Sequence, residues 1–93
     1  MFIFSVTAKS KKDQPGFKAG DSIPFIVYID FKDMFGAEKL CQIFLFKEGF
    51  HDIHIEKRKL IPNDKLDSQL IAQDKALAEA LDSGYMIQMF DAH

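Results

Sequence analysis

The fold depends most on the stretch Asp33–Arg58, DMFGAEKLCQIFLFKEGFHDIHIEKR. Its pattern predicts a helix that runs directly into a strand. Asp33 is a suitable N-cap, and Gly49 can supply the left-handed residue at which helices commonly end. Apolar residues recur between them at helical spacing: Ala37, Leu40, Cys41 and Phe44. Residues 43–46, IFLF, would also suit a strand. We interpret residues 36–48 as a helix.

The ten residues GFHDIHIEKR at the end of this stretch resemble a cluster of reactive groups. Side chains alternate between the two faces of a strand, so residues 51, 53, 55 and 57 should face one way and residues 52, 54, 56 and 58 the other. His51 and His54 then face opposite ways and cannot share a metal ion. Asp52, His54 and Glu56 share a face, but neighbours on one face lie about 6.5–7 Å apart, which suits chelation poorly. We predict no metal site.

The rest of the chain supplies three more strands and one more helix. Alternating apolar residues predict strands at 1–8, 23–31 and 85–92, and the basic connection at 9–22 is long. Leucines from Leu66 to Leu81 mark the second helix, for which Asp67, Ser68 and Asp74 are competing N-caps, and Gly84 ends it. We predict a single α+β domain over residues 1–93, of order β-β-α-β-α-β. It should be a two-layer sandwich in which a mixed four-stranded sheet carries two helices on one face.

Composition excludes several classes of function. A net charge of −2 over 93 residues argues against nucleic-acid binding, and no apolar run is long enough to span a bilayer. The one cysteine, Cys41, lies among apolar helix residues, which favours core packing over catalysis and fits a reducing cytoplasm. We read no secretory signal and no nucleotide, hydrolase or zinc motif. We therefore expect a cytoplasmic protein without a cofactor.

The sheet face turned away from the helices is the candidate binding surface. It combines large apolar groups with carboxylates, an amide and an imidazole, which is typical of an interface centre or a ligand floor. The predicted binding residues on this face are Tyr28, Asp30, Asp52, His54, Glu56, Gln88 and Phe90.

The helix at 36–48 is the second candidate surface. Residues 43–46 spread apolar groups over more than half of its circumference, so we expect it to be buried on more than one side. In a domain this small the additional burial favours a second subunit. We predict a homodimer with Ile43 and Phe46 at the interface.

The segments LCQIFLFKEGFHDIHIEK (residues 40–57) and ALAEALDSGYMIQMFDA (residues 76–92) both run from a helix through Gly and an aromatic residue into a strand. In this the chain resembles the small α/β orphan proteins carried on bacterial integron gene cassettes. The resemblance implies a cytoplasmic, often oligomeric protein without assigned chemistry.

Two functions remain open at this point. The sequence favours a non-enzymatic interaction protein that binds a protein partner or a small ligand through these surfaces. The alternative is a small enzyme or ligand-binding protein that uses the sheet face around His54, with Asp52, Glu56 and Tyr28.

Overall fold

A computed structural model describes residues 1–11, 13 and 18–89. The strands are β1 (Phe2–Ser10), β2 (Ser22–Ile29), β3 (Phe50–Leu60) and β4 (Tyr85–Met89). The helices are α1 (Met34–Lys47), α2 (Ser68–Gln73) and α3 (Lys75–Ser83), with one 3₁₀ turn, η1 (Asn63–Lys65). The predicted α+β class and element order are confirmed, and residues 40–46 are helical. The predicted strands at 1–8 and 23–31 shift slightly, and the part of the last one beyond Met89 lies outside the described residues.

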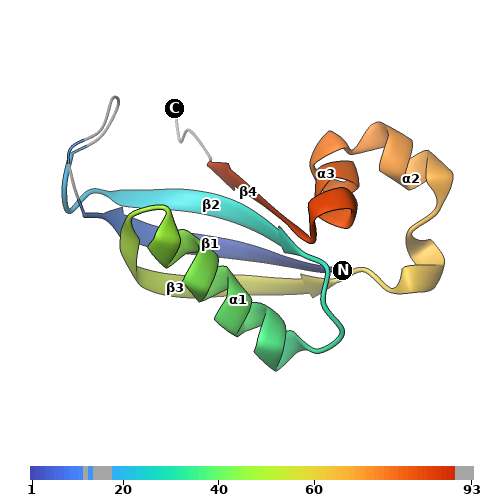
Figure 1. Ribbon diagram of the computed structural model, residues 1–93, viewed down its shortest axis with the longest axis horizontal. Helices are drawn as coiled ribbons and strands as arrows, with labels where there is room; N and C mark the ends of the chain where they lie inside the picture. Colours follow the sequence, from blue (N-terminus) through green and yellow to red (C-terminus); the bar gives the residue numbers. More distant parts are fainter. Residues whose placement is uncertain (12, 14–17, 90–93) are drawn as a thin grey trace.

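The four strands form one sheet in the order β3-β1-β2-β4 (Figure 1). Every neighbouring pair is antiparallel, so the sheet is not mixed as predicted. β2 and β3 do run in the same direction, because both are antiparallel to β1. The crossover through α1 therefore passes over β1 and places β3 on its far side, instead of pairing two parallel strands.

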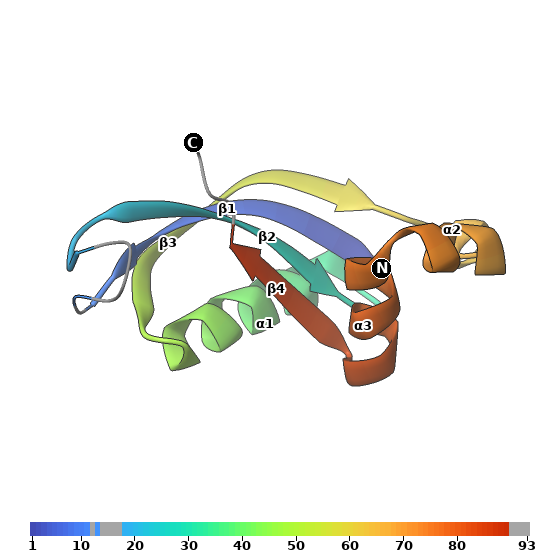
Figure 2. The ribbon, with the colours of Figure 1, turned by 90° about the horizontal axis from the view of Figure 1, so that it is seen from above.

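Helix α1 covers one face of the sheet and encloses the main core. Asp33 caps it, because its side chain accepts a hydrogen bond of 2.7 Å from the Gly36 amide, and Gly49 follows its end with φ +95°. Ala37, Cys41 and Leu45 form its buried stripe and are 0% exposed. They pack on the inward side chains of β1 and β2, among them Phe4, Phe25 and Val27. Figure 2 shows α1 along one side of the strands.

The second helical segment departs from the prediction of two helices on one face. Two of the three competing caps are used, since Asp67 caps α2 and Asp74 caps α3, while Ser68 is the first residue of α2. Leu77 and Ala80 of α3 pack on Met1 and Tyr28, which belong to the face opposite α1. The reason is that one end of this face is also apolar, and packing α3 there removes apolar surface from water. The strand residues in this cluster are Ile3, Ile26, Tyr28 and Met86. The two-layer packing of α1 on the sheet stands, and α2 and α3 add a cap at the end where β1 starts (Figure 1).

Strand β3 does not keep the strict alternation that the sequence predicts. Its register against β1 shifts twice, between the pairs of Ser5 and Val6 and between those of Thr7 and Lys9. Each shift adds one residue to β3, and near the second Asp52 has φ +51°, in the left-handed region. Arg58 thereby lies opposite Phe4, on the core face, and pairs with Glu38 of α1. The predicted opposite placement of the two histidines is also wrong. His51 lies opposite Lys9 and His54 opposite Thr7, which share one face of β1.

Candidate functional site

A surface groove runs between the exposed side of α1 and strand β3 at the open edge of the sheet. It consists of two adjoining hollows of about 800 and 300 Å³ that share Lys39, Gln42 and Ile53. We call it the α1–β3 groove. The residues that line it are Phe35, Glu38, Lys39, Gln42, Ile43, Phe46 and Lys47 of α1 and His51, Asp52, Ile53, His54, Ile55 and Arg58 of β3.

The α1 side of the groove carries three large apolar side chains that are open to solvent. Phe35 is 70% exposed, Ile43 49% and Phe46 58%. Helical spacing explains this arrangement, because Ala37, Cys41 and Leu45 already occupy the side that faces the sheet. α1 therefore has apolar side chains on two sides, of which the sheet covers one.

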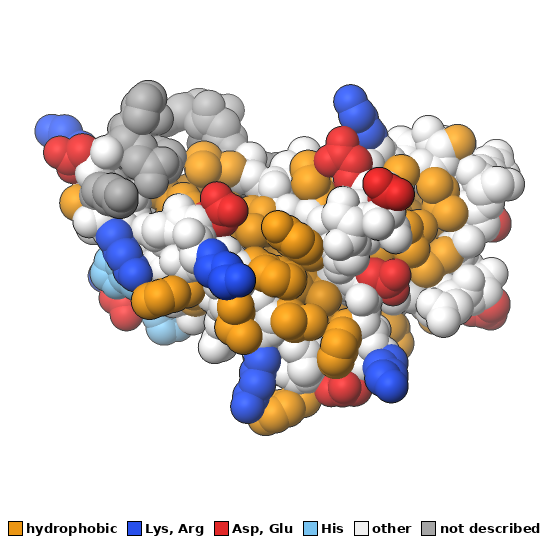
Figure 3. All heavy atoms as spheres, in the orientation of Figure 1, with side chains coloured by type: hydrophobic (Ala, Val, Ile, Leu, Met, Phe, Trp, Pro, Cys, Tyr) orange, Lys and Arg blue, Asp and Glu red, His pale blue; other side chains and the backbone are white. Residues whose placement is uncertain are grey.

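Positive charges surround this apolar strip. The Lys11 Nζ lies 3.5 Å from the centre of the Phe46 ring, and the Lys39 Nζ lies 5.0 Å from that of Phe35. Lys47 also lines the groove. Asp52, the acidic group on the β3 side, lies 3.7 Å from Lys9. Figure 3 shows apolar side chains gathered on the α1 side of the molecule, with Lys and Arg side chains around them.

The groove brings together part of both predicted surfaces. Asp52, predicted as a binding residue, lines the larger hollow with Ile43 and Phe46, predicted as interface residues, and His54 lines the adjoining smaller hollow. Glu56 lies next to them on β3 and accepts a hydrogen bond of 3.2 Å from the Thr7 hydroxyl. These residues were assigned to different surfaces because strict alternation separates the strand face from the helix. In the structure the predicted residues of β3 and of α1 meet at the edge of the sheet that β3 forms.

The remaining predicted residues lie away from the groove. Asp30 follows β2 and is exposed, and Gln88 is on β4, at the opposite edge of the sheet from His54. Three strand spacings, about 14 Å, separate these edges. Phe90 lies outside the described residues.

Tyr28 is a core residue in this structure. It is 9% exposed and packs beneath α3 with Leu77 and Ala80. Burial, and secondly the negative charge of Asp74, raise the pKa of its hydroxyl above the ordinary value. A tyrosine in this position stabilises the docking of α3 and is separated from His54 by the width of β1.

The groups with potential for covalent or metal chemistry do not converge. Cys41 is fully buried, and burial together with the nearby Glu38 raises the pKa of its thiol to about 12, so that it stays protonated at neutral pH. Within residues 1–11, 13 and 18–89, no three His, Cys, Asp or Glu side chains are grouped as a metal site requires. None of the helices in this part of the chain has the length and apolar character needed to cross a bilayer.

Phe35, Lys39 and Gln42 complete the groove and were not predicted as site residues. With Phe46 they recur at intervals of four, three and four residues, which places them on one side of a helix. That spacing was available in the sequence. Which side of α1 is left open was not, because that depends on where the sheet packs.

Comparisons with known proteins give no further assignment. No protein-family model matches the chain, and no curated protein or solved structure is found to be similar to it. The resemblance to integron-cassette proteins stays a prediction.

Proposed function

We propose that this chain is a non-enzymatic interaction protein that acts as a homodimer and binds a protein partner through the α1–β3 groove. The observation that carries the proposal is the apolar strip of Phe35, Ile43 and Phe46, which folding leaves exposed. Contiguous apolar surface of this kind on a small domain is typical of an interaction site.

The charges around the strip define the kind of partner that it fits. Lys11, Lys39 and Lys47 surround the aromatic groups and would attract carboxylates. We therefore infer a partner segment with apolar side chains for the centre of the groove and acidic side chains at its margins. A second copy of this chain is a poorer fit, because a symmetric contact across the groove would bring lysines together.

The enzyme alternative has less support in this geometry. His54 and Asp52 are exposed on a strand edge, and Tyr28 is buried elsewhere. General acid or base catalysis requires such groups to meet around one substrate position. The hollow beside His54 is lined equally by α1 and β3, and two of its charged groups of opposite sign, Glu38 and Arg58, are paired with each other.

Site-specific photo-crosslinking tests the proposal. A benzophenone amino acid replaces Phe46, and the matched control replaces Leu60, which is similarly exposed at 53% but lies outside the groove. We expect a cross-link from position 46 to an acidic segment of a different protein, and none from position 60. The cross-link should disappear when Lys39→Glu and Lys47→Glu are combined.

Light scattering tests the dimer separately. We expect a mass of about 21 kDa, twice the 10.6 kDa of one chain. A chain that stays monomeric at high concentration would contradict the homodimer. Cross-links from position 46 to a second copy of the chain would contradict the partner assignment.

A further inference from the structure

The two open edges of the sheet differ in their protection against pairing. β3 has two register shifts and a run of charged or titratable groups, features that prevent edge strands from pairing with other chains. These groups are His51, Asp52, His54, Glu56, Lys57, Arg58 and Lys59. β4, Tyr85–Met89, has no charged side chain and pairs with β2 without a register shift. It is the outermost strand on its side of the sheet (Figure 1).

Within the described part of the chain, no further strand pairs with the outer edge of β4. The Asp30 amide donates a hydrogen bond of 2.9 Å to the Gly84 carbonyl, and the register continues to Ile29 opposite Tyr85. In an antiparallel ladder, hydrogen-bonded and non-hydrogen-bonded positions alternate. The amides and carbonyls of Met86 and Gln88 therefore face β2, whereas those of Tyr85, Ile87 and Met89 face the open edge.

We propose that β4 pairs antiparallel with β4 of a second copy, with Ile87 opposite Ile87. This arrangement is the one in which the outward groups of both strands meet. Tyr85 of each copy then lies opposite Met89 of the other, on the α1 face of the sheet, and Met86 lies opposite Gln88 on the other face. The strand is self-complementary, because every opposed pair is uncharged and the central pair, Ile87 with Ile87, is apolar.

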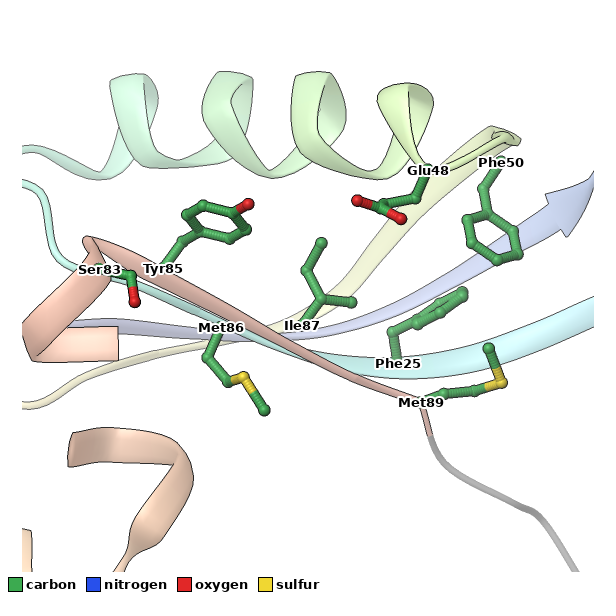
Figure 4. Close-up of a pocket in the computed structure, with 8 residues that line it drawn as sticks. All are labelled: Phe25, Glu48, Phe50, Ser83, Tyr85, Met86, Ile87 and Met89. Carbon is green, nitrogen blue, oxygen red and sulfur yellow. The ribbon is translucent and has the colours of Figure 1, made fainter. Parts of the chain in front are cut away.

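The side chains along β4 are poorly covered within one chain. Tyr85 is 36% exposed and Met89 47%. With Phe25, Phe50 and Ile87 they line a hollow of about 420 Å³ between β4 and the end of α1. Figure 4 shows Tyr85 and Ile87 pointing toward α1 and Met86 pointing away from it. Pairing would place the same side chains of a second copy beside this hollow and reduce its exposure to solvent.

The inference rests on the proposed function, since it says how the two copies of the proposed dimer meet. It also leaves the α1–β3 groove free in each copy, because β3 and β4 are opposite edges of the sheet. The joined strands would form one continuous sheet across the dimer. Because strands of five residues make a small contact, we expect a weak dimer, with a dissociation constant of roughly micromolar order.

A disulfide across the two copies tests the register directly. Opposed residues at a hydrogen-bonded antiparallel position have Cα atoms about 5.5 Å apart, within the range that a disulfide spans. Ile87→Cys should therefore form a covalent dimer under mild oxidation, while buried Cys41 stays unreactive. The matched control is Ile43→Cys in the groove, which should not form a covalent dimer. Cross-linking at position 43 instead of 87 would overturn the inference.

A proline variant tests the same contact without new thiols. The Met89 amide faces the open edge, so Met89→Pro removes no bond to β2 and should leave circular dichroism unchanged. We expect it to raise the dimer dissociation constant about tenfold or more, as measured by sedimentation, and Met89→Lys to do the same. A dimer dissociation constant that neither variant changes would refute pairing through β4 but leave the homodimer standing. A wild-type chain that is monomeric at all concentrations would refute the homodimer itself.

Discussion

Two alanine variants two residues apart on α1 test whether the groove is open in solution. Leu45 is 0% exposed on the side of α1 that faces the sheet, whereas Ile43 is 49% exposed on the groove side. Leu45→Ala therefore creates a cavity, whereas Ile43→Ala removes a side chain that is already half solvated. The two changes should therefore differ strongly in their effect on the free energy of unfolding.

The magnitudes follow from burial. Leu45→Ala should cost about 3–5 kcal/mol, because the lost transfer energy and the cavity add. Complete burial of an isoleucine stabilises by about 1.5–3 kcal/mol, so half burial of Ile43 contributes about 1 kcal/mol. Alanine is the better helix former by about 0.5 kcal/mol, which leaves a net cost for Ile43→Ala below about 1 kcal/mol.

Urea unfolding followed by circular dichroism at low protein concentration measures both costs. With a total stability of about 5–14 kcal/mol expected for a domain of this length, the difference is easily resolved. Equal costs for the two variants would mean that Ile43 is as buried as Leu45, and would refute an open groove beside α1. A cost for Ile43→Ala that grows with protein concentration would assign the groove to self-association.

Three further predictions concern Cys41, Asp52 and Asp74. The Cys41 thiol should resist iodoacetamide in the native protein. Because folding raises the pKa of this thiol to about 12, its contribution to stability is complete below pH 9.0 and is lost as pH rises toward 12, so the urea midpoint should fall over that range. Asp52→Gly should raise the free energy of unfolding by about 0.5–1 kcal/mol, since φ is +51° and the exposed Lys9 pair contributes little; a lower urea midpoint would contradict this. Asp74→Ala should cost about 1 kcal/mol through the lost cap of α3 and lower the pKa of Tyr28 in an ultraviolet titration, whereas an unchanged Tyr28 titration would count against their proximity.

Local signals in the sequence determined the elements of this protein. Asp33 and Gly49 define α1 because a cap and a left-handed glycine act within one helical turn. Strand β3, Phe50–Leu60, begins directly after Gly49, where the sequence predicts a strand to follow the helix. Asp67 and Asp74, recognised as rival caps, turned out to start two separate helices.

Tertiary structure alone decided which surfaces are available. The shifts in β3 turn Arg58 toward α1, because register depends on pairing with the distant strand β1. Asp52 thereby lines the groove with Ile43 and Phe46, and His54 lines its adjoining part. Tyr28 is buried because α3, nearly fifty residues later in the chain, packs on it. Alternation predicts which side chains share a face. Only the packing of distant elements determines which face stays open, and here it leaves open the groove beside α1 and the edge of β4.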